Sequence, residues 1–133
     1  MKIDHIAIWV NDLEEMKYFY MKYFGCTVNN KYENTGKRFS SYFLSFSEGA
    51  RVELMKRHDI VVRDNSNNLG LAHLAFQVES RSVVDSMTEK FEKDGFKVEG
   101  FPRITGDGYY ESVILDPENN RIELVANICI DKE

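Results

Sequence analysis

The stretch Gly70-Leu-Ala-His-Leu-Ala-Phe-Gln-Val-Glu-Ser-Arg81 repeats the beginning of the chain. Its Leu71–Val78 portion aligns with Ile3-Asp-His-Ile-Ala-Ile-Trp-Val10, and a histidine falls at the same place in both. Farther along, Arg51-Val-Glu-Leu-Met55 corresponds to Arg121-Ile-Glu-Leu-Val125, and each of these segments carries a glutamate. The chain is therefore one module of about 65 residues written twice.

This repeat predicts the domain organisation. The first module covers residues 1–57 and the second covers residues 70–127, while the polar segment 58–69 has the composition of a surface linker. A chain of 133 residues is short enough for both modules to form one domain, residues 1–133, around a shared core. The residues after Asn127 are expected to form a loose tail.

The composition excludes several classes of partner. Acidic residues outnumber basic ones by 22 to 17, which argues against nucleic acid, because a phosphate backbone attracts a basic surface. No apolar run approaches the ~20 residues that span a bilayer, and the N-terminus lacks a signal-peptide pattern, so we expect a cytoplasmic protein without a membrane partner. Cys26 and Cys129 lack the spacing of a metal site and are expected to be reduced thiols.

Hydrophobic periodicity predicts a strand, a helix and three further strands in each module, and so an α+β fold. In the first module, strands are expected over 2–10, 27–32, 39–46 and 51–56, with a helix capped by Asp12 and ended by Gly25. In the second module, strands are expected over 71–78, 97–101, 109–115 and 121–126, and residues 102–108 are expected to form a loop. The second helix is expected to begin at Ser80 or Ser82 and to end at Gly95.

Alternation along the strands separates the two faces of each sheet. The apolar positions are Ile6, Ile8, Val52 and Leu54 in the first module and Leu74, Phe76, Ile122 and Leu124 in the second. The repeated polar residues His5, Glu53, His73 and Glu123 have the opposite parity. Because one helix can cover only one face of its sheet, we expect the helix on the apolar face and the four polar side chains on the concave one.

Two histidines and two glutamates that face one concavity form a candidate metal site. Imidazole and carboxylate ligands suit Zn²⁺, Ni²⁺, Co²⁺, Mn²⁺ or Fe²⁺. Taken singly, each histidine is more often a satisfied structural residue and each glutamate a surface charge. The duplication favours the metal, because a carboxylate at a core-facing strand position is costly unless something compensates its charge.

The sequence resembles the vicinal oxygen chelate superfamily, and within it most closely glyoxalase I, or lactoylglutathione lyase. The resemblance covers nearly the whole chain and is carried by His5-Ile-Ala-Ile-Trp-Val10, Phe24-Gly25, Val52-Glu-Leu-Met55, His73-Leu-Ala-Phe-Gln-Val78 and Asp116-Pro-Glu-Asn-Asn-Arg-Ile-Glu-Leu124. It implies two tandem βαβββ modules that form a curled eight-stranded mixed sheet around a metal cleft. It also implies one divalent metal ion held by His5, Glu53, His73 and Glu123. By the same resemblance Glu123 is the first choice of catalytic base, with Glu53 as its pseudo-symmetric alternative.

The expected substrate is a small molecule with two neighbouring oxygens that undergoes proton transfer. We expect Trp9, Tyr42, Met55 and Tyr110 to line its pocket and Arg103 to meet a substrate anion. Bacterial relatives that bind glutathione tend to have an arginine where this chain has Trp9. Since an arginine pairs with carboxylates and a tryptophan does not, we expect weak or no activity on the glutathione hemithioacetal of methylglyoxal.

Two other functions remain compatible with the sequence. One is a metal-free binding or resistance protein of the bleomycin-resistance type, which has no need of four metal ligands. The other is a ring-cleaving dioxygenase, which uses two histidines and one glutamate on Fe²⁺ and would leave Glu53 without a role. For each function we expect a homodimer, because curled sheets leave edges that a second copy can cover.

Overall fold

The computed structural model describes residues 1–63 and 67–127. The chain forms two compact units, Met1–Asp64 and Asn65–Glu133, whose boundary falls within the expected linker. Cys129 and the expected tail lie outside the described residues, whereas Cys26 is a buried free thiol. The residues described include no helix that is both long enough and apolar enough to cross a bilayer.

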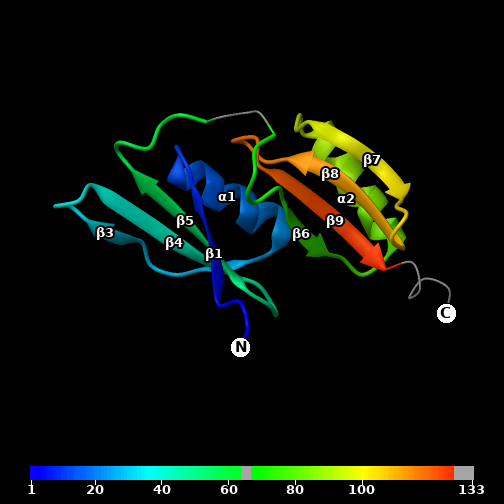
Figure 1. The fold of residues 1–133 in the computed structure, drawn as a ribbon, viewed down its shortest axis with the longest axis horizontal. Helices are drawn as coiled ribbons and strands as arrows, with labels where there is room; N and C mark the ends of the chain where they lie inside the picture. Colours follow the sequence, from blue (N-terminus) through cyan, green and yellow to red (C-terminus); the bar gives the residue numbers. More distant parts are fainter. Residues whose placement is uncertain (64–66, 128–133) are drawn as a thin grey trace. The chain divides into compact units, whose positions relative to one another are not determined.

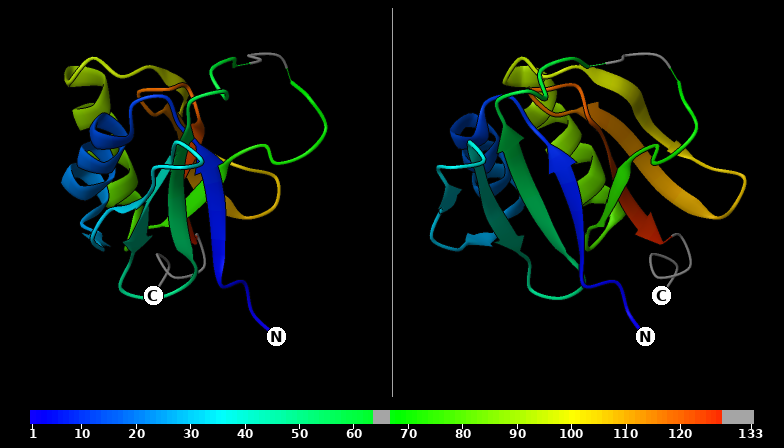
Figure 2. Two further views of the ribbon diagram at one scale, coloured as in Figure 1. Left: turned by 90° about the vertical axis from the view of Figure 1, so that its left-hand side faces the viewer. Right: turned by 60° about the vertical axis from the view of Figure 1, so that its left-hand side comes forward.

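The first unit is a mixed sheet with one helix on one of its faces (Figures 1 and 2). Its elements are β1 (His5–Trp9), α1 (Leu13–Phe24), β2 (Thr27–Val28), β3 (Tyr32–Asn34), β4 (Phe39–Ser45) and β5 (Arg51–Arg57). The strand order is β1-β5-β4-β2, and β3 also pairs with β4. Because β1 runs parallel to β5 and lies directly beside it, the N-terminal histidine segment meets the strand that carries Glu53.

Local sequence signals set the bounds of α1. The Asp12 carboxylate accepts a hydrogen bond of 3.0 Å from the backbone N–H of Glu15, which satisfies one of the unpaired donors at the helix start. Gly25 ends the helix with φ 64°, a left-handed conformation that glycine adopts without steric cost. The inner face of the helix buries Met16, Phe19 and Tyr20. The predicted helix is therefore confirmed, and so is its apolar face.

The second unit repeats this arrangement, with one helix against one face of its sheet (Figure 1). Its elements are β6 (Leu74–Gln77), α2 (Arg81–Lys93), β7 (Val98–Ile104), β8 (Tyr109–Leu115) and β9 (Arg121–Asn127), in the sheet order β6-β9-β8-β7. Ser80 caps α2 by accepting a hydrogen bond from the Val83 N–H, so the first of the two expected caps is the correct one. As in the first unit, the opening strand β6 runs parallel to the closing strand β9.

The core of each unit lies between its helix and its sheet. Leu44 and Leu54 are fully buried in the first unit, and Ile114, Ile122 and Leu124 are fully buried in the second. One polar bridge lies inside the second core: the hydroxyls of Thr88 on α2 and Ser112 on β8 are 2.7 Å apart. Apolar burial of this kind contributes roughly 1.5–3 kcal/mol for each large side chain.

The structure corrects three expectations about the strands. The described residues form two separate sheets, not one eight-stranded sheet. The expected strand 27–32 is broken into β2 and β3, because the Asn29 side chain accepts the Phe43 N–H at 2.8 Å in place of a regular ladder. The expected loop at 102–108 begins later, since β7 continues through Pro102 to Ile104 with two register shifts, and the edge position tolerates a proline.

Candidate functional site

In the first unit, strand register brings His5 and Glu53 to the same side of the sheet. His5 pairs with Arg51 and Ala7 pairs with Glu53, so the histidine and the glutamate are diagonal neighbours on one face. Their Nε2 and Oε1 atoms are 3.7 Å apart, too far for a hydrogen bond. The neighbours of Glu53 along β5, Val52 and Leu54, are buried on the other face. The face assignment made from strand parity is thus correct for this pair.

The Asp4 carboxylate bonds to the His5 ring at Nδ1, the nitrogen that does not face Glu53, and also binds Arg51. Asp4 Oδ2 lies 2.7 Å from His5 Nδ1 and 2.7 Å from Arg51 Nη2. The hydrogen bonds from His5 and Arg51 lower the pKa of Asp4, so this group is a carboxylate and accepts from both. In the neutral imidazole, Nδ1 then carries the proton and Nε2, on the Glu53 side, keeps its lone pair. Carboxylate partners of this kind commonly orient metal-binding histidines.

The second unit contains the equivalent pair. Ala75 on β6 pairs with Glu123 on β9, as Ala7 pairs with Glu53, and His73 lies one residue before β6. The distance from His73 Nε2 to Glu123 Oε1 is 3.2 Å. The Glu123 side chain is 16% exposed and that of Glu53 is 14% exposed, so both carboxylates are mostly removed from water. Each unit therefore presents one imidazole nitrogen and one shielded carboxylate oxygen side by side.

A second carboxylate, Glu111, lies beside the pair in the second unit. Glu111 on β8 pairs with Val125, two residues from Glu123 on the same face of β9. Burial raises the pKa of Glu111, and the negative charge of Glu123 raises it further. The guanidinium of Arg103 acts in the opposite direction from 3.6 Å. The first unit has Ser41, an uncharged residue, at the equivalent position beside Met55.

The donor set of these two pairs fits a divalent transition metal. Two imidazole nitrogens and two carboxylate oxygens are ligands of the type that Zn²⁺, Ni²⁺, Co²⁺, Mn²⁺ and Fe²⁺ take. Among the described residues, no group of three or more histidine, cysteine or acidic side chains lies close enough together to hold a metal ion.

Trp9 and Met55 lie on the His5 face, where the sequence places them. They pair with each other across β1 and β5, one row beyond Ala7 and Glu53. The Trp9 indole is edge-on to Phe39, at 6.2 Å between ring centres, and the Arg57 guanidinium lies 5.2 Å from the Trp9 ring centre. Arg57 has the same parity as Glu53 and Met55, so this wall of the first unit carries a cation.

Tyr42 and Tyr110 lie on the opposite faces of their sheets, which corrects the expectation that they line the pocket. Tyr42 pairs with Leu54 and donates a hydrogen bond of 2.8 Å to Glu14 on α1. Tyr110 likewise donates to Asp85 on α2. Both have the parity of the apolar core residues of their own strands, and this signal is sufficient to place them on the helix side. These tyrosines connect helix to sheet in both units.

Arg103, the expected anion-binding residue, pairs across the sheet with Glu111 and is 55% exposed at its side chain.

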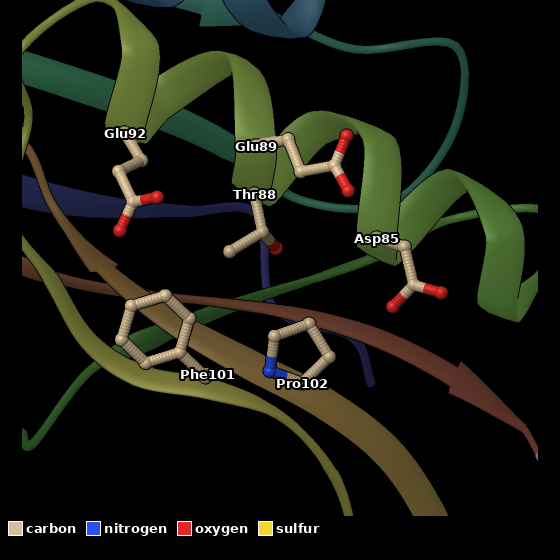
Figure 3. A pocket seen from close by; sticks show the side chains of 6 residues that line it. All are labelled: Asp85, Thr88, Glu89, Glu92, Phe101 and Pro102. Atoms are coloured by element: carbon tan, nitrogen blue, oxygen red, sulfur yellow. The ribbon is translucent and has the colours of Figure 1, made fainter.

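The hollow in Figure 3 is separate from the His73–Glu123 pair: it is a groove of about 400 Å³ between α2 and β7. It is lined by Asp85, Thr88, Glu89, Glu92, Phe101 and Pro102. Since Thr88 bonds to Ser112 on the core side of β8, this groove is on the helix side of the sheet and not on the His73 face.

Sequence reasoning left Arg57 out of the candidate site, although its parity along β5 is that of Glu53 and Met55. In the structure Phe39 and Arg57 lie in one row beyond Met55, and Glu111 is aligned with Val125. The parity of these residues follows from their own strands, but their neighbours depend on which strands pair. The edge strand β1 and the closing strand β5 are far apart in sequence, and parallel pairing between them is a property of the fold.

Comparison with known proteins agrees with this description. An uncharacterised protein of Bacillus subtilis, YqjT, is 30% identical over 132 residues, covering 94% of this chain and 98% of the relative. The probable lactoylglutathione lyase of Vibrio cholerae is 26% identical over 130 residues, covering 95% of this chain and 91% of the relative. In fold, glyoxalase I from Zea mays superposes with a TM-score of 0.76 at 21% identity.

That superposition covers 96% of this chain and 47% of the maize chain, so the present chain spans about half the length of that enzyme. The family model of the Glyoxalase/Bleomycin resistance protein/Dioxygenase superfamily matches residues 2–124, which include both His–Glu pairs. Together with the repeated strand–helix–sheet units, this match shows that the chain belongs to the Glyoxalase/Bleomycin resistance protein/Dioxygenase superfamily.

Proposed function

We propose that the protein is a metal-dependent lyase or isomerase of the glyoxalase I type that moves a proton on a small substrate with two neighbouring oxygens. The observation that supports this proposal is the duplication of one arrangement, in which His5 with Glu53 and His73 with Glu123 occupy equivalent registers. Fold likeness alone does not choose among reactions, because one fold hosts many activities. The polar pairs are what favour this chemistry.

In this proposal His5, Glu53, His73 and Glu123 hold one divalent ion. When bound, the ion would supply Lewis-acid stabilisation of negative charge on the substrate oxygens. The Asp4 carboxylate keeps the proton of His5 on Nδ1, so that Nε2 is available as a ligand. The two glutamates are shielded from water, which suits carboxylates that act as ligands or as bases.

The proton is moved by a carboxylate of this set. Glu123 takes it from the carbon beside the carbonyl and returns it to the neighbouring carbon, as the same group acts first as base and then as acid. Glu53 is the alternative, because its unit is built in the same way. Glu111 lies beside Glu123 on the same face, whereas the first unit has the uncharged Ser41 at the equivalent position, and this difference supports Glu123 as the base.

The substrate is not necessarily a glutathione adduct. Trp9 occupies the strand position at which glutathione users tend to have an arginine. We therefore expect the glutathione hemithioacetal of methylglyoxal to be a poor substrate. We also propose that the functional form is a homodimer in the cytoplasm.

Metal content of protein purified without chelators tests this function. We expect about one transition-metal ion per chain in the wild type by elemental mass spectrometry. Glu53→Gln and His73→Ala should each reduce metal affinity by at least about tenfold, because changing even a residue that only supports a metal ligand costs 10- to 100-fold. The matched controls are Glu48→Gln and His58→Ala, two exposed residues outside the pairs.

The controls should retain the metal content of the wild type. If Glu53→Gln and His73→Ala also retain it, the proposed ligand set is wrong. If all five proteins lack metal even after incubation with each candidate ion, the metal-free binding protein becomes the better description. Circular dichroism of every variant shows that any loss does not come from unfolding.

A further inference from the structure

A row of aromatic side chains lies on the His5 face of the first unit, beyond the metal-ligand candidates. Trp9, Met55, Ser41 and Tyr32 are aligned across four strands. Phe39 and Arg57 pair in the next row of the same face. The Phe39 ring centre is 6.2 Å from that of Trp9 and 6.0 Å from that of Tyr32, with edge-on or steeply tilted geometry in both contacts. The three rings thus form one continuous surface.

This surface is open to solvent. Trp9 is 39% exposed and Tyr32 is 52% exposed, whereas the helix side of the same strands is fully buried at Leu44 and Leu54. Exposed aromatic residues that gather on one face, next to polar groups, are typical of binding surfaces. A purely structural role would account for one such ring at a strand end, but it accounts poorly for three rings in contact.

Arg57 supplies a cation at this surface, and two contacts fix its position. Its guanidinium lies over the Trp9 ring at 5.2 Å, and its Nε donates to Asp59 at 2.6 Å. Within residues 1–63 and 67–127 this guanidinium makes no other hydrogen bond, so its two terminal amino groups remain for a ligand. A planar guanidinium held in this way binds carboxylates and planar anions better than a flexible ammonium does.

The spacing between this surface and the proposed metal site restricts the ligand. The Trp9–Met55 row follows the Ala7–Glu53 row by two residues, which corresponds to about 7 Å along a strand. In a ligand that contacts both the aromatic row and the proposed metal site, the ring or conjugated group would lie about 7 Å from the reacting oxygens. This is compatible with a small aromatic metabolite and less so with a three-carbon compound.

We propose that Trp9, Phe39, Tyr32 and Arg57 form a subsite for a planar aromatic or conjugated group that bears a negative charge. The inference deepens the proposed function. It rests on that function only where it identifies this group as the non-reacting end of the substrate. Affinity comes from stacking on the rings and from charge-assisted hydrogen bonds to Arg57. The Asp59 carboxylate offsets part of the positive charge of the subsite, and its hydrogen bond to Arg57 keeps the guanidinium plane fixed.

Three small probes separate the contributions of ring and charge. Benzoate is planar and anionic, benzamide is planar and neutral, and cyclohexanecarboxylate is anionic without an aromatic ring. Binding is measured on chelator-treated protein by ligand-observed NMR and by the fluorescence of Trp9, the single tryptophan of the chain. We expect benzoate to bind at least about tenfold more tightly than either comparison probe, with a Kd on the order of 1 mM that is typical of a fragment.

Variants assign the two contributions to residues. Arg57→Gln should remove the advantage of benzoate over benzamide, and Phe39→Leu should reduce its advantage over cyclohexanecarboxylate. Arg57→Lys should retain only part of the charge effect, because the ammonium lacks the planar fork. The control is Lys56→Gln, which changes the adjacent residue of β5, on the opposite face, and should leave all three affinities unchanged.

Equal affinities for the three probes would overturn the proposal, and so would identical effects of Arg57→Gln and Lys56→Gln in folded protein. The probe experiment does not depend on a metal, because the chelator removes any bound metal ion from the protein. His73→Ala should therefore bind benzoate as the wild type does. If the ligand variants show that the metal assignment is wrong but the three probes bind as expected, the proposed reaction is excluded. The subsite for an aromatic anion then still stands.

Discussion

At the scale of single residues, the two His–Glu pairs differ in their surroundings. The His5 ring bonds to Asp4, which also binds Arg51. The Phe43 ring is edge-on to the His5 ring, with 5.1 Å between ring centres. The pair in the second unit has Glu111 and Arg103 beside it. The repeat thus keeps one histidine and one glutamate in each unit, while the neighbours of the two pairs differ. Under the proposed function, this asymmetry would let one glutamate act as the base while the other acts only as a ligand.

The buried Glu111 gives a pH prediction. Its pKa is raised by burial and by Glu123, so its ionisation opposes folding. The stability contribution of its protonated form is complete below the unfolded pKa of about 4.3 and is lost as pH rises through the raised folded pKa. In metal-free protein, Glu111→Gln should therefore have a higher Tm than the wild type at pH 7, with the difference disappearing near pH 4.

Thermal unfolding followed by circular dichroism at both pH values measures this difference. Glu89→Gln, at an exposed position of α2, is the control and should show little change at either pH. A Glu111→Gln protein that is less stable than the wild type at pH 7 would show that the ion pair with Arg103 outweighs burial. The exposure of Arg103 makes that outcome unexpected, because solvent screens such pairs.

At the scale of elements, the β8–β9 connection depends on one buried carboxylate. Asp116 is 2% exposed and accepts hydrogen bonds of 2.9 Å from the backbone N–H groups of Glu118 and Asn120 and from the Asn120 side chain. These bonds fold the loop between the strands that bear Glu111 and Glu123. The loop therefore fixes the register on which the second half of the site depends.

Asp116→Ala should destabilise the protein by about 3 kcal/mol, because it leaves shielded donors without an acceptor. Asp116→Asn keeps an oxygen for the two backbone donors and should cost about 1 kcal/mol. Urea unfolding with a constant m-value measures both changes. Equal losses in the two variants would mean that the negative charge, and not the acceptor geometry, stabilises this connection.

At the scale of the whole molecule, the two units have the same architecture and open sheet edges. In the described residues, β1 and β6 are each paired along one side only, by β5 and β9. Such edges favour association with another chain. We expect static light scattering to give twice the chain mass of 15.5 kDa. A single species of 15.5 kDa at micromolar protein would exclude a stable dimer.

The sequence by itself determined the module repeat, the two helices with the Asp12 cap of the first, and the side of the sheet on which each repeated polar residue lies. These features are local, since they depend on periods of 2 and 3.6 residues and on single capping side chains. Only the tertiary structure decided that the opening strand of each unit lies beside its closing strand. Parallel pairing of β1 with β5 creates the diagonal contact of His5 with Glu53, and it places Trp9 beside the Phe39–Arg57 row of β4 and β5. Contacts between strands distant in sequence depend on the packing of the whole unit, and no local pattern specifies them.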